Sequence, residues 1–492
     1  MALVWEQYPV KDAAKVPVIT NWTPLIGYML FRNDTNYLNT LFYYQLVLEV
    51  YTGTSVVAAN IIASIRQRRN GYSDDVANGK ARAYFDLRDI ANTQLVDTVF
   101  DQNDTGDVFR SIHTIGANTA TKPYSHNGDS KLPKTQICSL TVKGFENYSS
   151  AANTSPTDQT DNVTDTQHYT QASLPLFTPR SVIGGSIDTD FLQGDNFNVY
   201  APDSGTDKFL SDVESSTGDY NLSGYLNYVQ DTDYHTVAFL NDATEFASDL
   251  FTMLIKYYDS DNSIIGSAQG IDNVGGGGGY GGAKPNTVST DAERLIYFGC
   301  GPANLQAQSA TPGANPSNFT DWAYYTIQGI NASISTTTAL YYFIKEDGSC
   351  KGYKVRRLAF RNSLGCYDYL NFKRKSTQTV DVQRNTYSSL IGRYNASKFI
   401  YNDTQRGKDT RQVTAGLKET LNTDWLSEEQ ANLVEKLIMS TSVYMVENAD
   451  TTYTQGVMVT NSTHIRKTVA NDKVKIQYTI NIEYANPLNT NS

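Results

Sequence analysis

Few residues of this 492-residue chain have the types and spacing that catalysis or metal binding requires. The five histidines form no H-E-x-x-H pair, and the four cysteines form no C-x-x-C pair. A G-x-S-x-G nucleophile motif is also missing from the sequence. The residues therefore predict neither a zinc site nor a nucleophilic hydrolase, and we expect the cysteines to be buried free thiols.

One acidic stretch comes close to a calcium loop. Residues 101–106 (DQNDTG) match its first, third and sixth positions, but the twelfth position is Ile112, where a bidentate Glu is required. The glycine-rich stretch at 274–282 is predicted to be a flexible loop rather than a phosphate cradle. Scattered Asp and Glu residues carry no weight for glycoside hydrolysis in so acidic a chain. We expect no cofactor, no metal and no enzymatic activity.

The strongest structural pattern lies near the C-terminus, at residues 473–484. Apolar and polar residues alternate there without a break, which predicts a half-buried strand of roughly 40 Å. The residues of its apolar side are Val474, Ile476, Tyr478, Ile480, Ile482 and Tyr484.

A helix is predicted shortly before this strand, over residues 427–446. Ser427 is its expected N-cap and Gln430 completes a capping box. The apolar stripe that follows has helical spacing, so one face of the helix should lie on a sheet. Its members are Leu433, Val434, Leu437, Ile438, Thr441, Tyr444 and Met445.

An aromatic hairpin is predicted at residues 354–375, with Tyr367, Tyr369 and Phe372 across from Leu358 and Phe360. Together with the helix and the terminal strand it supplies the residues expected to carry packing or assembly. These candidates are Leu433, Leu437, Ile438, Tyr444, Ile476, Tyr478, Ile480, Ile482, Phe360, Tyr367 and Tyr369.

Composition favours sheet over helix, because Tyr occurs 34 times and charged residues make up only 18%. The predicted fold is mainly β, with several β-sandwich-like domains and a C-terminal helix packed on a sheet. Residues 398–423 are polar and indicate neither helix nor strand clearly. The expected parts are an N-terminal β-sandwich-like domain (1–148), a flexible polar arm or loop (149–173), a central β domain (174–350) and a C-terminal α+β domain (351–492).

Charge and hydropathy limit the partners. The net charge is −11 with no long basic run, which argues against sequence-specific nucleic-acid binding. No apolar run reaches the roughly 18 residues that span a membrane, and the first residues lack a signal-peptide core, so we expect no membrane partner.

Three stretches resemble virion structural proteins of tailed bacteriophages, of the neck, collar or tail region. They are LAFRNSLGCYDYLNF (358–372), DWLSEEQANLVEKLIMSTSVYMV (424–446) with HIRKTVANDKVKIQYTINIEYAN (464–486), and more weakly LRDIANTQL (87–95). The resemblance implies a ring or tail-hub protein that is assembled into the virion in the host cytoplasm. Its expected partners are copies of itself and other neck or tail proteins.

Two other classes of function remain open. Exposed Tyr and Trp side chains could stack on sugar rings, as in a receptor- or glycan-binding protein at the tail tip. A tail-associated glycan hydrolase has only scattered carboxylates in its favour. The leading hypothesis is a non-enzymatic, oligomeric ring, collar or tail-hub layer around the DNA channel, whose acidic surface DNA would slide past.

Overall fold

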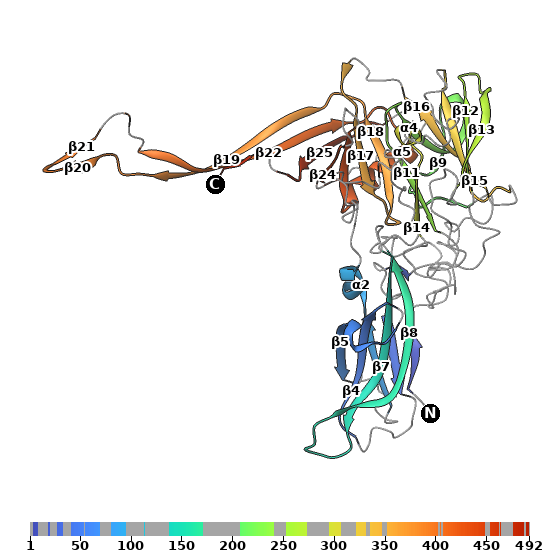
Figure 1. Cartoon of the computed structure of the whole chain (residues 1–492), viewed down its shortest axis with the longest axis vertical. Helices are drawn as coiled ribbons and strands as arrows, with labels where there is room; N and C mark the ends of the chain where they lie inside the picture. Colours follow the sequence, from blue (N-terminus) through green and yellow to red (C-terminus); the bar gives the residue numbers. More distant parts are fainter. Residues whose placement is uncertain are drawn as a thin grey trace. The chain divides into compact units, whose positions relative to one another are not determined.

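The computed structural model describes residues in each of the four expected parts of the chain. Its described residues are 3–7, 18–19, 27–32, 41–53, 55–68, 80–94, 113, 137–170, 207–240, 252–272, 295–306, 321–330, 335–346, 352–401, 404, 407–447, 453–461, 463, 476–486 and 489–491. They are mainly β with few helices, as the composition predicts (Figure 1). The candidate calcium loop at 101–106 and the glycine-rich stretch at 274–282 lie outside these residues.

The chain divides into two compact units. Unit 1 comprises residues 1–345 and 362–368, and unit 2 comprises residues 346–361 and 369–492. The predicted start of a C-terminal domain at residue 351 falls within the first segment of unit 2. The first three predicted parts belong to unit 1, apart from residues 346–350.

The N-terminal part of unit 1 is a sandwich of two sheets around one core. Alternating apolar residues on β4 and β7 face those on β3 and β6, and Leu46, Leu48, Leu30 and Phe85 are completely buried between the sheets. The five-stranded sheet has the order β2(Val18–Ile19), β8(Thr157–Thr170), β7(Ile137–Ser149), β4(Phe42–Thr52), β5(Ile61–Arg68). The other has the order β1(Leu3–Gln7), β3(Gly27–Arg32), β6(Ala81–Asp86), and short helices are η2(Ala58–Asn60) and α2(Arg88–Gln94).

Residues 149–173 differ from the prediction of a flexible arm or loop. Their larger part forms strand β8, which pairs with β7 from Tyr148↔Thr157 to Ile137↔Thr170. Only residues 150–156 form a turn between the two strands. The prediction failed because it weighed side chains alone, whereas a strand of Thr, Asp and Gln can be held by backbone hydrogen bonds while its outer side remains in water.

The central part of unit 1 is a six-stranded sheet rich in tyrosine. Its core pairs aromatic rings of neighbouring strands, for example Tyr325 stacked on Phe343 at 5.0 Å between centroids. The strand order is β13(Ile264–Asp272), β12(Thr252–Tyr258), β15(Tyr324–Ile330), β16(Tyr341–Lys345), β10(Ser223–Val229), β9(Ser215–Thr217). A separate pair is β11(Thr236–Leu240) with β14(Leu295–Gly299), and short helices are η5(Asp219–Asn221) and α4(Pro302–Gln306).

Unit 2 is built on an eight-stranded antiparallel sheet and one capped helix. The sheet order is β18(Tyr367–Phe372), β17(Arg356–Arg361), β23(Val443–Glu447), β24(Tyr453–Val459), β25(Thr479–Tyr484), β22(Lys408–Asn422), β19(Thr377–Ser388), with β26(Asn489–Asn491) also paired to β22. Every residue of β17 and β18 is buried, as the predicted aromatic hairpin requires, and the hairpin tip at 362–368 is counted with unit 1.

The helix α5(Glu428–Met439) begins where predicted and ends earlier. The Ser427 hydroxyl accepts from the Gln430 backbone N–H, and the Gln430 side chain accepts from the Ser427 N–H. Ser440 has extended backbone angles, and the chain continues as β23, so Tyr444 and Met445 lie on a strand rather than on the helix. Short polar and β-branched residues at 440–442 explain this end, because they favour turns and strands over a further helical turn.

The C-terminal strand is shorter than its sequence pattern. The ladder of β25 covers Thr479–Tyr484, and Ile476 forms an isolated bridge with Leu426. Residues 473–475 lie outside the described residues. Alternation thus identified the buried face correctly at Ile476, Ile480, Ile482 and Tyr484, whereas only part of it is paired in a sheet.

Candidate assembly arm

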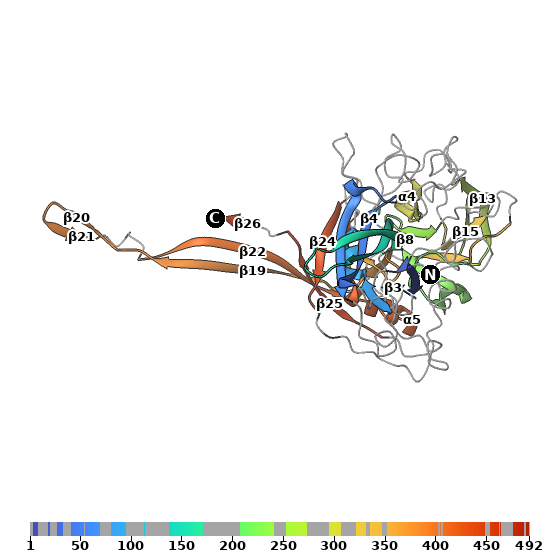
Figure 2. The same ribbon diagram turned by 90° about the horizontal axis from the view of Figure 1, so that it is seen from below.

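The longest strands of unit 2, β19 and β22, continue beyond its core as a ribbon, to which β26 adds a short third strand along residues 413–415 of β22. β19 and β22 pair from Thr377↔Thr420 to Ser388↔Lys408, whereas β25 contacts only the last residues of β22, from Lys418 to Asn422. At about 3.4 Å per residue, twelve residues of β19 span roughly 40 Å. Figures 1 and 2 show this ribbon leaving the sheet of unit 2, and residues 377–422 are called the β-arm here.

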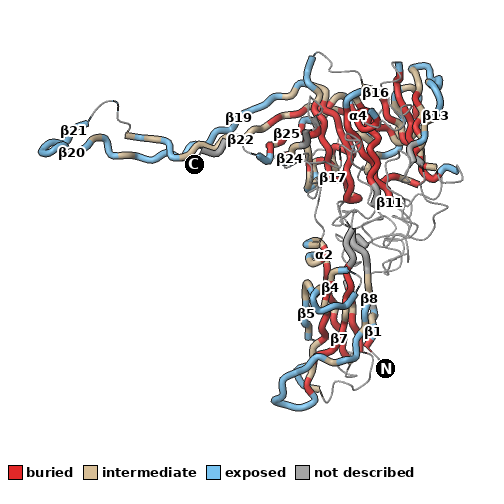
Figure 3. The backbone as a smooth tube through the Cα atoms, in the orientation of Figure 1, coloured by how far each residue is buried: buried red, intermediate tan, exposed pale blue. Residues whose placement is uncertain are grey.

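The tip of the β-arm is a small hairpin, β20(Arg393–Asn395) with β21(Lys398–Ile400). Ala396 has a positive φ of 51° in the turn, and Gly392 has a φ of 111° beside the Phe399 ring, where a Cβ would come within 2.5 Å of the ring. Tyr394 and Phe399 pack edge to face at 5.3 Å. Leu390 and Tyr394 are each 82% exposed, so the tip presents apolar groups to solvent (Figure 3).

The two sides of the ribbon differ. Residues directly opposite each other in a sheet share a face, and the register pairs Val380 with Leu417 and Val382 with Ala415. The other side carries Thr379, Asp381, Gln383, Lys418 and Thr414. We define the apolar arm face by five residues: Val380, Val382, Val413, Ala415 and Leu417.

This apolar face continues a face that is buried in the core. Leu421, four residues after Leu417 on β22, is fully buried opposite Ile480, and Glu419 lies opposite Ile482. Along the arm the same face emerges into solvent, where Val380 is 53% exposed. The β-arm is therefore an extension of the core sheet from which the covering layer is missing within the described residues.

A buried carboxylate fixes the base of the arm. Glu419 Oε1 accepts from Arg356 Nε at 2.8 Å, and its Oε2 accepts from Tyr484 Oη at 2.7 Å and from Gln378 Nε2 at 3.1 Å. Burial alone would raise the pKa of Glu419, but these hydrogen bonds and the Arg356 charge outweigh it and lower that pKa below its usual value. The ionised group ties β17, β19 and β25 to β22.

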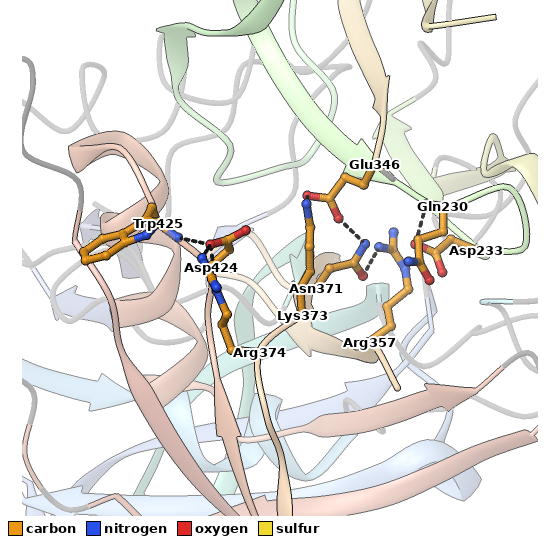
Figure 4. A network of polar contacts seen from close by, with 9 residues as sticks. All are labelled: Gln230, Asp233, Glu346, Arg357, Asn371, Lys373, Arg374, Asp424 and Trp425. Carbon is orange, nitrogen blue, oxygen red and sulfur yellow. Dashed lines mark hydrogen bonds and ion pairs between the residues drawn. The ribbon is translucent and has the colours of Figure 1, made fainter. Parts of the chain in front are cut away.

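Further polar contacts hold the strand that leads into the arm. Lys373 pairs with Glu346 at 2.5 Å, and Glu346 also accepts from Asn371, whose amide oxygen accepts from Arg357 (Figure 4). One residue on, Arg374 donates to Asp424 from two nitrogens, at 2.7 and 3.0 Å.

The cost of burying Asp424 would raise its pKa, but the Trp425 backbone N–H and Arg374 outweigh burial and lower the pKa. These ion pairs sit at the root of β19 and β22, so the arm leaves a fixed base.

The distal arm is basic, unlike the rest of the chain. Residues 384–411 carry a net charge of +4 in a chain of net charge −11, which leaves −15 on the remainder. The basic residues are Arg384, Arg393, Lys398, Arg406, Lys408 and Arg411, and the acidic residues are Asp403 and Asp409.

Two histidines and two cysteines of the described residues are buried among the core residues. His113 and His235 lie edge-on against Tyr367 and Phe343, and Cys300 and Cys366 are buried. Among the described residues, no group of three or more His, Cys, Asp or Glu side chains could hold a metal ion. No helix in that part of the chain is long and apolar enough to cross a membrane.

The packing candidates fall into two groups. Eight are buried: Leu433, Leu437, Ile476, Ile480, Ile482, Phe360, Tyr367 and Tyr369. Ile438, Tyr444 and Tyr478 are half-buried. The sequence pattern located these core positions but missed the β-arm, in which residues 398–423 indicated neither helix nor strand clearly. The alternation of Val413, Ala415, Leu417, Glu419 and Leu421 was the available signal.

Comparisons with known proteins give no relative: no protein-family model, no curated protein and no solved structure matches the chain. The β-arm and the sheet that carries it are therefore the basis for a function.

Proposed function

We propose that the chain is a non-enzymatic structural component of a tailed phage particle, and that it forms an oligomeric ring, collar or tail-hub layer around the DNA channel. The observation that carries the proposal is the β-arm, a ribbon of roughly 40 Å with an apolar face and an apolar tip in solvent.

A ribbon of this kind is poorly stabilised in an isolated molecule. Beyond the residues that pair with β26 the ribbon has two strands, and a two-stranded hairpin is marginally stable in water by itself. β19 is also the last strand of its sheet in the described residues, and an unpaired strand edge invites pairing with another chain. Both liabilities disappear when the arm contacts a neighbour, which is the situation of a subunit in an assembly.

The stretches that resemble phage virion proteins support the same proposal. Residues 358–372 form the β17 and β18 hairpin, and residues 424–446 supply α5 and β23 of the same sheet. The resemblance therefore falls on the elements that anchor the β-arm.

The direct test is the composition of the purified particle of the phage that encodes this chain. Quantitative mass spectrometry should find the protein in multiple copies per particle, in a number that matches a cyclic ring. Absence from particles, or turnover of envelope glycans that one Asp or Glu substitution abolishes, would contradict the proposal.

Receptor or glycan binding at the tail tip is the second candidate. Exposed rings at the arm tip favour it, because Tyr394 is 82% and Tyr401 is 68% exposed and sugar rings stack on such surfaces. A glycan array with wild-type protein and the Tyr394→Ala, Tyr401→Ala double variant tests it. Binding lost in the variant would favour this function over a ring.

A further inference from the structure

We infer that the β-arm docks on a second copy of this chain, with the apolar arm face as its contact surface and the basic distal segment as its steering charge. The inference rests on the proposed function only in that both require self-association. It adds the surface and the partner.

The apolar arm face has the composition of an interface core. Val380, Val382, Val413, Ala415 and Leu417 form a continuous strip on one side of the ribbon, and the opposite side is polar. This strip continues the buried face that holds Leu421 and Ile480. A second layer of protein could therefore pack on it as one sheet packs on another. The described residues of the chain itself leave the strip uncovered at Val380 and Val382.

Charge identifies the partner as another copy. The distal arm carries +4 and the remainder of the chain −15, so an arm is attracted to the body of a neighbour, whereas two bodies repel each other. Repulsion between bodies combined with attraction between arm and body favours contacts made through arms. It also predicts association that weakens as salt screens the charges.

Other anionic partners fit the arm less well. Nucleic acid would contact the basic residues, but its phosphates would make no favourable contact with the valine and leucine side chains of the apolar arm face. An anionic membrane would attract the tip and repel a body of −15. A protein surface with acidic character satisfies both the apolar strip and the basic tip.

Sedimentation velocity over a concentration series tests the inference. The wild-type chain should associate reversibly, and the Val380→Thr, Val382→Thr, Leu417→Thr variant should associate at least about tenfold more weakly, because residues in the core of an interface dominate affinity. Threonine keeps the β-propensity of the strands. The matched control is Gln383→Thr with Gln412→Thr on the opposite face, which should associate like the wild type.

The steering charge has its own variant. Arg393→Glu with Lys398→Glu should weaken association at low salt and lose most of the salt dependence. A wild-type chain that stays monomeric at every concentration, or a threonine variant that associates like the wild type, would overturn the inference. So would arm-dependent binding of duplex DNA or of phosphatidylcholine and phosphatidylserine vesicles in place of self-association.

Zero-length cross-linking provides a readout that does not depend on how a variant folds. In a mixture of unlabelled and ¹⁵N-labelled wild-type protein, Lys398 and Lys408 should form mixed-isotope links to Asp or Glu residues outside the arm. Absence of such links would contradict docking between copies. If the protein forms these links and associates but is absent from particles, this inference stands and the phage function is wrong. If particles contain the threonine variant in normal copy number, the phage function stands and this inference is wrong.

Discussion

Asp368 is a fully buried acid of unit 1 with an unusual proton affinity. Its carboxylate accepts from the Ser211 hydroxyl at 2.6 Å, the Asp212 backbone N–H at 2.8 Å and the Asn362 amide at 3.1 Å. Burial, and then the nearby Asp212 carboxylate, raise the pKa of Asp368 to about 7, although these hydrogen bonds act in the opposite direction. The contacts join the turn at 362–366 to residues 211–212.

The raised pKa predicts a loss of stability toward neutral pH. An unfolded Asp ionises near pH 4, at about 3.9, whereas folded Asp368 keeps its proton until about pH 7. Between these values the unfolded state binds fewer protons than the folded state, so the free energy of unfolding falls as pH rises and levels off above pH 7. Urea unfolding from pH 4 to 8 should show this fall in the wild type, and Asp368→Asn should reduce it. Parallel pH profiles of the two proteins would contradict the assignment.

The pKa of Glu419, at the base of the arm, is shifted in the opposite direction. Its lowered pKa means that the ionised form stabilises the fold at neutral pH, and that this stability is lost as pH falls through the folded pKa, below about 4.5. Glu419→Ala should lower the free energy of unfolding of unit 2 by about 3–5 kcal/mol at pH 7, because it removes the carboxylate from a buried pair with Arg356.

Denaturant unfolding followed by a probe in unit 2 measures this change. Asp381→Ala, which breaks the exposed pair with Lys418 further along the arm, is the control and should leave stability nearly unchanged. Equal effects of the two substitutions would show that the Glu419 network does not anchor the arm.

Among the elements, α5 gives the clearest test of packing. Leu437 is fully buried, so Leu437→Ala should reduce the free energy of unfolding by about 2–5 kcal/mol. Met439, two residues later on the same helix, is 60% exposed, and Met439→Ala should change stability by less than about 0.5 kcal/mol. A small effect at Leu437 would mean that the apolar stripe of the helix does not face a core.

Which elements could be predicted from the sequence depends on whether one face is buried. The N-terminus of α5 was predictable because its cap is a local chemical arrangement between Ser427 and Gln430. β12 and β25 were predictable because burial of one face imposes an alternation on their residues. The end of α5 was missed because Tyr444 and Met445, which lie on strand β23, also fit helical spacing.

The β-arm and β8 were missed for the opposite reason. The residues of β8 are almost all polar and those of β19 are all exposed, so hydrophobic periodicity is weak and each strand resembles a loop in composition. What holds these strands is backbone pairing to a neighbouring strand, between β7 and β8 and between β19 and β22. That pairing is a property of the folded sheet, and the composition of a single segment does not contain it.

At the scale of the whole molecule, the distal arm has a net charge of +4, whereas the remainder of the chain has a net charge of −15. This arrangement combines an acidic body, which repels DNA and other bodies, with a basic and partly apolar arm that can cross to a neighbour. In the proposed ring, such an arm would join neighbouring copies around the channel.

The most direct test of this account is cryo-electron microscopy of the purified phage particle. The account predicts several copies of the chain around a cyclic axis, each with Val380, Val382 and Leu417 buried against the next copy. A single copy per particle, or a ring in which these three side chains remain in solvent, would contradict it.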